Sequence, residues 1–298
     1  MATATMTTIE DTGAGQAPGV SPAPTATAVT PENRRSGGAN SNIPNHNPSL
    51  SVPKGIIDEL LLVCGVIGSN MPDPSNKNRL VPVTDCINWL QDLQRALRRD
   101  DDSYRPISLL IGQWRVVPQK LLPLVLGCRY DTPLILTVLK ILVILTKPLS
   151  DQAKRAGKTA IDIKSKKIPE SVLQEQMKLR DNALAQAELL IEYKRIFVHH
   201  ASHRQSNKKE GGLLSVFVSL LAEPLSKTGS SRTDTDHLTI ELVLHLFRNL
   251  LSAEPLLKGS SDKSYESAML HQELIGLFER ELVLDILLVI AQEMESRE

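Results

Sequence analysis

The sequence has few aromatic residues, with only two Trp, four Tyr and four Phe among 298 residues. Proteins that bind single-stranded nucleic acid by base stacking interleave aromatic side chains with basic ones. The basic runs of this chain lack interleaved aromatics, which excludes a stacking platform. Any contact with nucleic acid is therefore expected to reach the phosphates and to carry no sequence readout.

Cysteine is also scarce, and the three thiols at Cys64, Cys86 and Cys128 are far apart in apolar or helical surroundings. An odd number with these spacings gives neither a disulfide framework nor a zinc pattern, which favours core thiols in a reducing compartment. Apolar runs are short as well, because Lys140 and Arg248 interrupt the longest ones, whereas a membrane-spanning helix needs about 20 apolar residues. We expect a soluble intracellular protein.

Sequence motifs for catalysis are missing, since the chain contains no GxGxxG, GxxxxGK[ST], GxSxG, HExxH or CxxC. His199 and His203 could form a metal-binding pair on one helix face, but histidines at the end of a helix also complement its carbonyl dipole. The acidic run Asp100–Asp102 fits either a Mg²⁺ site or a solvated turn. Without a nucleophile or a phosphate loop, the sequence predicts no enzyme, no metal and no cofactor.

The net charge is zero, but the charges are unevenly distributed. Residues 147–210 hold 14 Lys and Arg against 8 Asp and Glu, whereas residues 211–298 hold 7 against 14. Such a division suits a protein that contacts phosphates with one surface and basic partners with another. Ordinary solvated helix faces produce the same counts, so both interpretations stay open.

A long apolar helix is the most informative feature of the chain. The segment 236–257, DHLTIELVLHLFRNLLSAEPLL, places Leu238, Leu242, Leu246 and Leu250 in one row at i, i+4 steps, with apolar residues on both flanks. A helix that is apolar over so much of its circumference is buried on more than one side.

Two other segments, 135–149 and 213–225, repeat this arrangement of an apolar helix closed by a proline and a leucine. Repeated helices that cannot bury their apolar surface alone are the units of stacked α-solenoids. The sequence therefore predicts an all-α protein with an armadillo/HEAT-like α-solenoid and no β-sheet.

The chain divides into a tail and an array. Residues 1–53 are a low-complexity segment of Ala, Thr, Gly, Pro, Ser and Asn that is expected to be disordered. Residues 54–298 are expected to form the solenoid, which looks truncated because no polar repeat caps its end. Helices are predicted from Pro53 to the break at Gly68, over 84–99 with Thr84 as N-cap, and over 106–114, 117–126, 132–147, 169–200, 213–225, from 237, 265–277 and 279–294.

Residues 150–168, SDQAKRAGKTAIDIKSKKI, interrupt the array with six basic residues against two acidic ones. They hold too few apolar residues at helical spacing to pack, so we predict a loop. A loop of this length in a compact domain is usually functional or disordered.

Four motifs resemble, in order, those of the N-terminal domain of the Timeless family. The segment Leu110-Ile111-Gly112-Gln113-Trp114 is similar to the family's variable-Leu-Gly-x-Trp signature, and a Leu-Leu-Pro helix follows it. A Leu-Thr-x-Pro sequence and an Ile-Glu…Leu-x-Arg-Asn helix come later, and the matches together cover about residues 54–295. The motif residues are Leu110, Gly112, Trp114, Pro123, Thr146, Pro148, Glu241, Arg248 and Asn249.

This resemblance implies a non-enzymatic scaffold subunit of the replication fork protection complex. Such a protein is nuclear, pairs with a Tipin-like protein, travels with the replicative MCM helicase, and binds duplex DNA ahead of it. It supports fork pausing and the S-phase checkpoint. The alternative from the residues is a generic armadillo-like peptide-binding adaptor, which would present a ladder of Asn side chains, whereas the sequence offers Asn249 alone among the buried helices.

Within the last motif, Arg248 and Asn249 invite a functional interpretation. Buried polar groups normally need partners, so Asn249 could instead bond the backbone of an adjacent helix and Arg248 could pair with an acidic neighbour.

Charge and resemblance together give a hypothesis for the basic residues. We expect them to contact duplex phosphates or an acidic helicase surface at the fork. They are Lys154, Arg155, Lys158, Lys164, Lys166 and Lys167 in the predicted loop, joined by Arg204, Lys208 and Lys209.

Overall fold

The computed structural model describes residues 52–70, 80–158, 169–202, 212–227, 231–256 and 261–295. All of them belong to the unit His46–Glu298, the second of the two units into which the chain divides. The predicted tail at residues 1–53 lies almost wholly outside the described residues.

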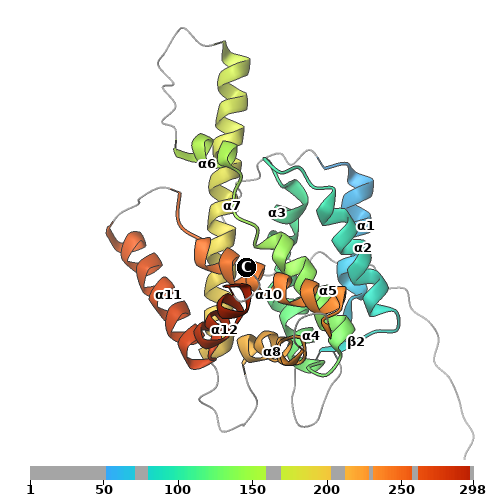
Figure 1. Ribbon diagram of the computed structural model, residues 1–298. Coiled ribbons are helices and arrows are strands. Elements are labelled where there is room, and N and C mark those ends of the chain that lie inside the picture. The colour runs from blue at the N-terminus through green and yellow to red at the C-terminus, as the bar shows by residue number, and fades with distance from the viewer. Residues whose placement is uncertain are drawn as a thin grey trace, which may run out of the picture. The chain divides into compact units, whose positions relative to one another are not determined.

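The described part is mostly helical, as predicted (Figure 1). No helix in it is long and apolar enough to cross a membrane. Its elements are α1 (Lys54–Val66), β1 (Gly68–Asn70), β2 (Leu80–Pro82), α2 (Cys86–Arg98), α3 (Pro106–Gln113), the π-helical turn η1 (Val117–Leu121), α4 (Leu122–Gly127), α5 (Thr132–Leu145), α6 (Asp151–Lys158), α7 (Glu170–Ser202), α8 (Leu213–Ser219), α9 (Ala222–Ser226), α10 (Asp234–Ser252), α11 (Ser261–Arg280) and α12 (Val283–Glu295).

A short β-hairpin corrects the prediction that the fold has no β-sheet. Strands β1 and β2 pair antiparallel, with Gly68 opposite Pro82 at one end of the ladder. Proline has no N–H for the ladder and is tolerated at such an end. The Lys120 ammonium donates a 2.8 Å hydrogen bond to the Gly68 carbonyl and so connects the hairpin to η1. Pairing between two three-residue segments leaves no periodic signal in the sequence.

Helices that are distant in the sequence lie side by side in rows. In one row α2 packs on α5 and α5 on α10; in a second α3 packs on α7 and α7 on α11; in a third α4 packs on α8. The rows are visited in a repeating order along the chain: α2, α3, α4, then α5, α7, α8, then α10, α11. In Figure 1, α7 stands between α3 and α11.

Helix α10 is buried mainly along the row that the sequence predicted. Leu242, Leu246 and Leu250 are buried, and Leu246 is fully inaccessible to solvent. Leu238 is 40% exposed, which corrects its placement in the core. The helix begins with a capping box in which Thr233 accepts a hydrogen bond from the Asp236 amide while the Asp236 carboxylate accepts one from the Thr233 amide.

Two predictions about individual helices are wrong. Thr84 is not the N-cap of α2, because Asp85 occupies that position with φ of 63° and makes no side-chain capping bond. The predicted helix at 213–225 is broken into α8 and α9. A proline ring crowds the carbonyl of the residue four positions earlier, and for Pro224 that residue is Leu220, which lies in the break.

The prediction of a loop over 150–168 is wrong for the first half of that segment, because α6 forms there. The buried face of α6 consists of Ala153 and Gly157, one helical turn apart. A Cβ added at Gly157 would lie 2.6 Å from Leu256 and 3.5 Å from Ala183 of α7. The helix is thus held by close approach of small residues, a pattern that a search for large apolar side chains does not find.

Candidate functional site

Two family-motif residues, Thr146 and Asn249, meet at the end of α5. The Asn249 amide of α10 donates hydrogen bonds to the Val143 carbonyl at 3.2 Å and to the Thr146 hydroxyl at 3.3 Å. Thr146 in turn donates to the Leu142 carbonyl at 2.7 Å. Asn249 and Thr146 are both buried. Of the two interpretations of Asn249, the structure confirms the bond to the backbone of an adjacent helix.

Arg105, which the sequence analysis missed, completes this junction. Its guanidinium donates to the carbonyls of Lys147 at 2.6 Å and Pro148 at 2.8 Å, directly after α5. The side chain is buried, and burial lowers the pKa of Arg105 from its ordinary value. Its backbone has φ of 43°, in the left-handed region. No motif marks Arg105, because its partners lie more than forty residues away.

The acidic run at Asp100–Asp102 has a capping role at its first residue. The Asp100 carboxylate accepts hydrogen bonds from the amides of Ile107 and Ser108 and from the Ser108 hydroxyl, all within the first turn of α3. Burial raises the pKa of this carboxyl. Asp102 pairs with Lys147 at 2.7 Å. Asp101 and Asp102 are exposed at a turn, as the solvated-turn interpretation expected, whereas Asp100 is half-buried and caps α3.

Gly112 of the first motif lies where α3 crosses α7. A Cβ at this position would come within 2.5 Å of the Leu189 side chain, closer than van der Waals contact permits. Leu110 is buried, whereas Trp114 and Pro123 are half-buried. A side chain at position 112 therefore requires the Leu189 side chain to move, because the obstructing atoms belong to that side chain.

The charged residues of the last motif face solvent. Arg248 is exposed and its nearest described polar contact is the Asn249 oxygen at 3.5 Å, so the predicted acidic partner is not found among the described residues. Glu241 is also exposed and lies 3.9 Å from His245.

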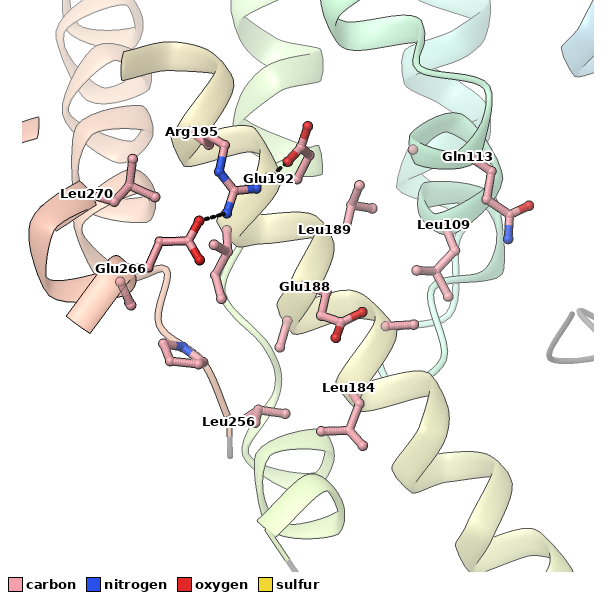
Figure 2. A pocket seen from close by; sticks show the side chains of 16 residues that line it. Leu109, Gln113, Leu184, Glu188, Leu189, Glu192, Arg195, Leu256, Glu266 and Leu270 are labelled. Atoms are coloured by element: carbon pink, nitrogen blue, oxygen red, sulfur yellow. Dashed lines mark hydrogen bonds and ion pairs between the residues drawn. The ribbon is translucent and has the colours of Figure 1, made fainter. Parts of the chain in front are cut away.

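A cleft of about 710 Å³ lies between α3, α7 and α11 (Figure 2). Helix α7 forms its floor, α3 and α11 form its walls, and Pro255 and Leu256 also line it. The lining is mainly apolar, and its large apolar side chains are Leu109, Leu184, Leu189, Ile191, Leu256 and Leu270.

Charged side chains gather toward one end of the cleft. Arg195 of α7 bonds Glu192 at 2.6 Å and Glu266 of α11 at 2.7 Å, so it bridges floor and wall. Arg115 lies 3.9 Å from Glu192. Glu188, one helical turn before Glu192, is exposed in the cleft and has no ion pair among the described residues. Figure 2 places its carboxylate between the charged end and the apolar end marked by Leu184 and Leu256.

A second contact between α7 and α11 lies next to the cleft. The Lys194 ammonium is buried and lies 2.9 Å from Nδ1 of His271, while it donates to the Ala253 carbonyl at 3.3 Å. Burial lowers the pKa of Lys194, and the nearby Glu254 carboxylate opposes this change. Burial and the Lys194 charge likewise lower the pKa of His271.

The basic residues predicted to bind phosphates are only partly described. Lys154, Arg155 and Lys158 are exposed on α6, and Lys154 lies 4.0 Å from Asp151. The other predicted residues lie outside the described part of the chain; they are Lys164, Lys166, Lys167, Arg204, Lys208 and Lys209.

The described cysteines and metal candidates add no site. Cys64 and Cys86 are buried as predicted, and burial raises their thiol pKa values to about 12 and about 11. Cys128 is half-buried. Among the described residues, no group of three or more His, Cys, Asp or Glu could hold a metal ion, and His203 of the predicted pair lies outside them.

The expectation that Asn249 is the only asparagine in the buried helices is wrong. Asn249 is not alone among buried helices, because Asn182 of α7 is buried too and accepts a 2.6 Å hydrogen bond from Gln186. Neither asparagine lines the cleft.

These observations define a mostly helical protein whose helices pack in ordered rows around a cleft. The family model described as Timeless protein matches residues 80–298, and the chain belongs to the Timeless family. This confirms the resemblance found in the motifs.

Two curated relatives show the same similarity. The Protein timeless homolog of Homo sapiens is 26% identical over 233 residues, which make up 78% of this chain and 16% of that protein. The Protein timeless homolog of Mus musculus is 25% identical over 241 residues, or 80% of this chain and 17% of that protein. The chain therefore spans well under a quarter of the length of these relatives.

Proposed function

We propose that the chain acts as a non-enzymatic scaffold of the replication fork protection complex and supports fork stability, fork pausing and the S-phase checkpoint. The observation that carries the proposal is the family match over residues 80–298. In this role the protein is nuclear and binds a Tipin-like protein, the replicative MCM helicase and duplex DNA.

The proposed architecture is an armadillo-like α-solenoid. In a solenoid each repeat packs against its neighbours, so equivalent helices form continuous rows. The repeating order of α2, α3, α4, then α5, α7, α8, then α10, α11 across three rows supports a three-helix repeat. The short α6 and α9 are then insertions between repeat helices.

The proposed DNA contact uses the basic residues between α5 and α8. The exposed basic face of α6, with Lys154, Arg155 and Lys158, supports this location. A charged side chain that neutralises a phosphate releases a condensed counterion, so affinity for duplex DNA should fall with salt by a log–log slope of roughly 0.9 per phosphate.

The experiment is an anisotropy titration of a fluorescent duplex at several salt concentrations. The parent chain is compared with two triple reversals to Glu, one of Lys154, Arg155 and Lys158 and one of Lys164, Lys166 and Lys167. Each variant should lose affinity for duplex DNA by the same factor whatever the DNA sequence, and its affinity should depend less steeply on salt. Circular dichroism should show that the helicity is unchanged.

The matched control reverses three exposed arginines of α2 and its C-terminus, Arg95, Arg98 and Arg99, which changes the net charge by the same amount. Unchanged affinity and slope in both test variants would remove this region from the DNA interface. Pull-downs with a Tipin-like protein and with MCM subunits then test the remaining contacts of the proposed scaffold.

A further inference from the structure

The cleft between α3, α7 and α11 has the size and lining of a binding site. Its volume of about 710 Å³ falls within the range of roughly 300–1,000 Å³ that is usual for ligand sites. Its floor is a stripe along α7 at helical spacing, Leu184, Glu188, Ile191 and Arg195. A site of this volume accepts a few large side chains but not the whole cross-section of a helix, which is about 10 Å wide.

The charges of the cleft select the sign of its ligand. Among the described residues, the carboxylates of Glu188, Glu192 and Glu266 line it together with one guanidinium, that of Arg195. Arg195 is already shared between Glu192 and Glu266, which leaves Glu188 without an ion pair among the described residues. A cationic group placed over Glu188 would meet an unsatisfied carboxylate beside apolar walls.

The polar groups of the cleft also select the backbone conformation of a peptide ligand. An extended peptide brings an unpaired donor and acceptor at each residue, whereas a helix satisfies its own backbone. Apart from the charged residues, the described side chains that line the cleft offer only the Gln113 amide and the Ser267 hydroxyl as hydrogen-bonding groups. These two groups cannot serve an extended backbone along the cleft, and the lining therefore suits a helix.

We propose that this cleft docks an amphipathic helix of a partner protein, with large apolar side chains at i, i+3 or i+4 and i+7 inserted between α3 and α11 and a Lys or Arg on Glu188. This is the helix-in-groove mode of recognition. The inference does not rest on the proposed role at the fork, and its test contains no DNA.

The test is a selection from a displayed library of helical peptides of about 18 residues, with one apolar face and randomised flanking charges. The full chain is the target, and the variant Ala185→Arg, which projects a long side chain into the cleft, is used for counter-selection. Ala185 is half-buried and lines the cleft. Selected peptides should carry apolar residues at the stated spacing together with Lys or Arg.

The second measurement does not depend on how Ala185→Arg folds. A synthetic peptide from the selection should bind the Glu188→Lys variant at least about tenfold more weakly than the parent, because attraction becomes repulsion at a partly desolvated site. The matched control Glu175→Lys makes the same change at an exposed position of α7 outside the cleft and should leave the affinity unchanged.

Three results would overturn the proposal. One is a selection whose peptides bind Ala185→Arg as well as the parent, and another is enrichment of Asp or Glu in place of Lys or Arg. The third is a parent chain that dimerises in light-scattering measurements and becomes monomeric on Ala185→Arg, since the occupant would then be a second copy of the chain.

Discussion

The Asn249 amide of α10 donates a hydrogen bond to the Thr146 hydroxyl of a segment 103 residues earlier. The same amide reaches the Val143 carbonyl at 3.2 Å. If the helix continued, the Val143 carbonyl would accept a hydrogen bond from the Lys147 amide. Here the Lys147 amide donates to the Ile144 carbonyl instead. Asn249 thus supplies the partner that the end of α5 lacks, which explains why a buried amide belongs in this helix.

Replacing Asn249 should test this relationship directly. Asn249→Leu keeps a similar volume but leaves the Val143 carbonyl buried without its partner, so we expect a loss of about 1–3 kcal/mol in the free energy of unfolding. The exposed neighbour Arg248 is the matched control, and Arg248→Ala should change stability by less than about 0.5 kcal/mol. Urea melts of both variants provide the measurement. Equal effects would mean that the junction is not held by this amide.

Gly112 gives a second prediction, about the contact between α3 and α7. Gly112→Ala places a Cβ within 2.5 Å of Leu189, and we expect overpacking to cost about 1–3 kcal/mol. Leu189→Ala removes the obstructing atoms. The double variant should therefore lose less free energy of unfolding than the two single variants together, by at least about 0.5 kcal/mol. Strict additivity in the double-mutant cycle would show that the glycine serves another purpose.

Much of the fold could be predicted where large apolar residues follow a helical period. The apolar side chains of α5, α7 and α10 make those helices visible in the sequence, and the predicted bounds lie close to the observed ones. Helix α6 was missed because Ala153 and Gly157 pack by their small size. The break at Leu220 was not predicted, because the apolar pattern of the segment continues through it. Only the position of Pro224, four residues later, indicates the break.

The sites were less predictable, because they depend on contacts between distant segments. The motif residues Thr146 and Asn249 could be picked out, but their mutual bond could not. Arg105 carries no local signal, and Glu188 is unremarkable until α3 and α11 are placed on either side of α7. A single sequence allows the apolar face of each helix to be predicted. It does not show which of these faces pack against each other.

The core row of α10 gives a third prediction. Leu246 is fully buried and Leu238 is 40% exposed on the same helix. Leu246→Ala should cost roughly 2–5 kcal/mol, as large-to-small changes in cores do, whereas Leu238→Ala should cost much less. Thermal and urea unfolding of the two variants would compare them on an equal chemical change. A loss below about half a kcal/mol at Leu246 would contradict the packing of α10 on α5.

The contact between Lys194 and His271 gives a prediction about pH. Protonation of His271 would set an imidazolium against the buried ammonium 2.9 Å away, and burial and this charge hold the pKa of His271 below its ordinary value. Below about pH 6.5 the unfolded chain therefore binds a proton on this histidine that the folded chain resists, so stability is fully present above that pH and is lost as pH falls toward the folded pKa.

The variant His271→Asn removes this titration and should flatten the fall in stability as the pH decreases below about 6.5, measured by urea unfolding in a series of buffers. His237→Asn is the matched control, because it makes the same exchange at an exposed position at the start of α10, outside this contact. The nearby Glu254 carboxylate opposes the shift, so Glu254→Gln should make the loss steeper in the same window. If His271→Asn and the parent lose stability at the same rate, the proton is accommodated elsewhere and the contact between α7 and α11 does not sense pH.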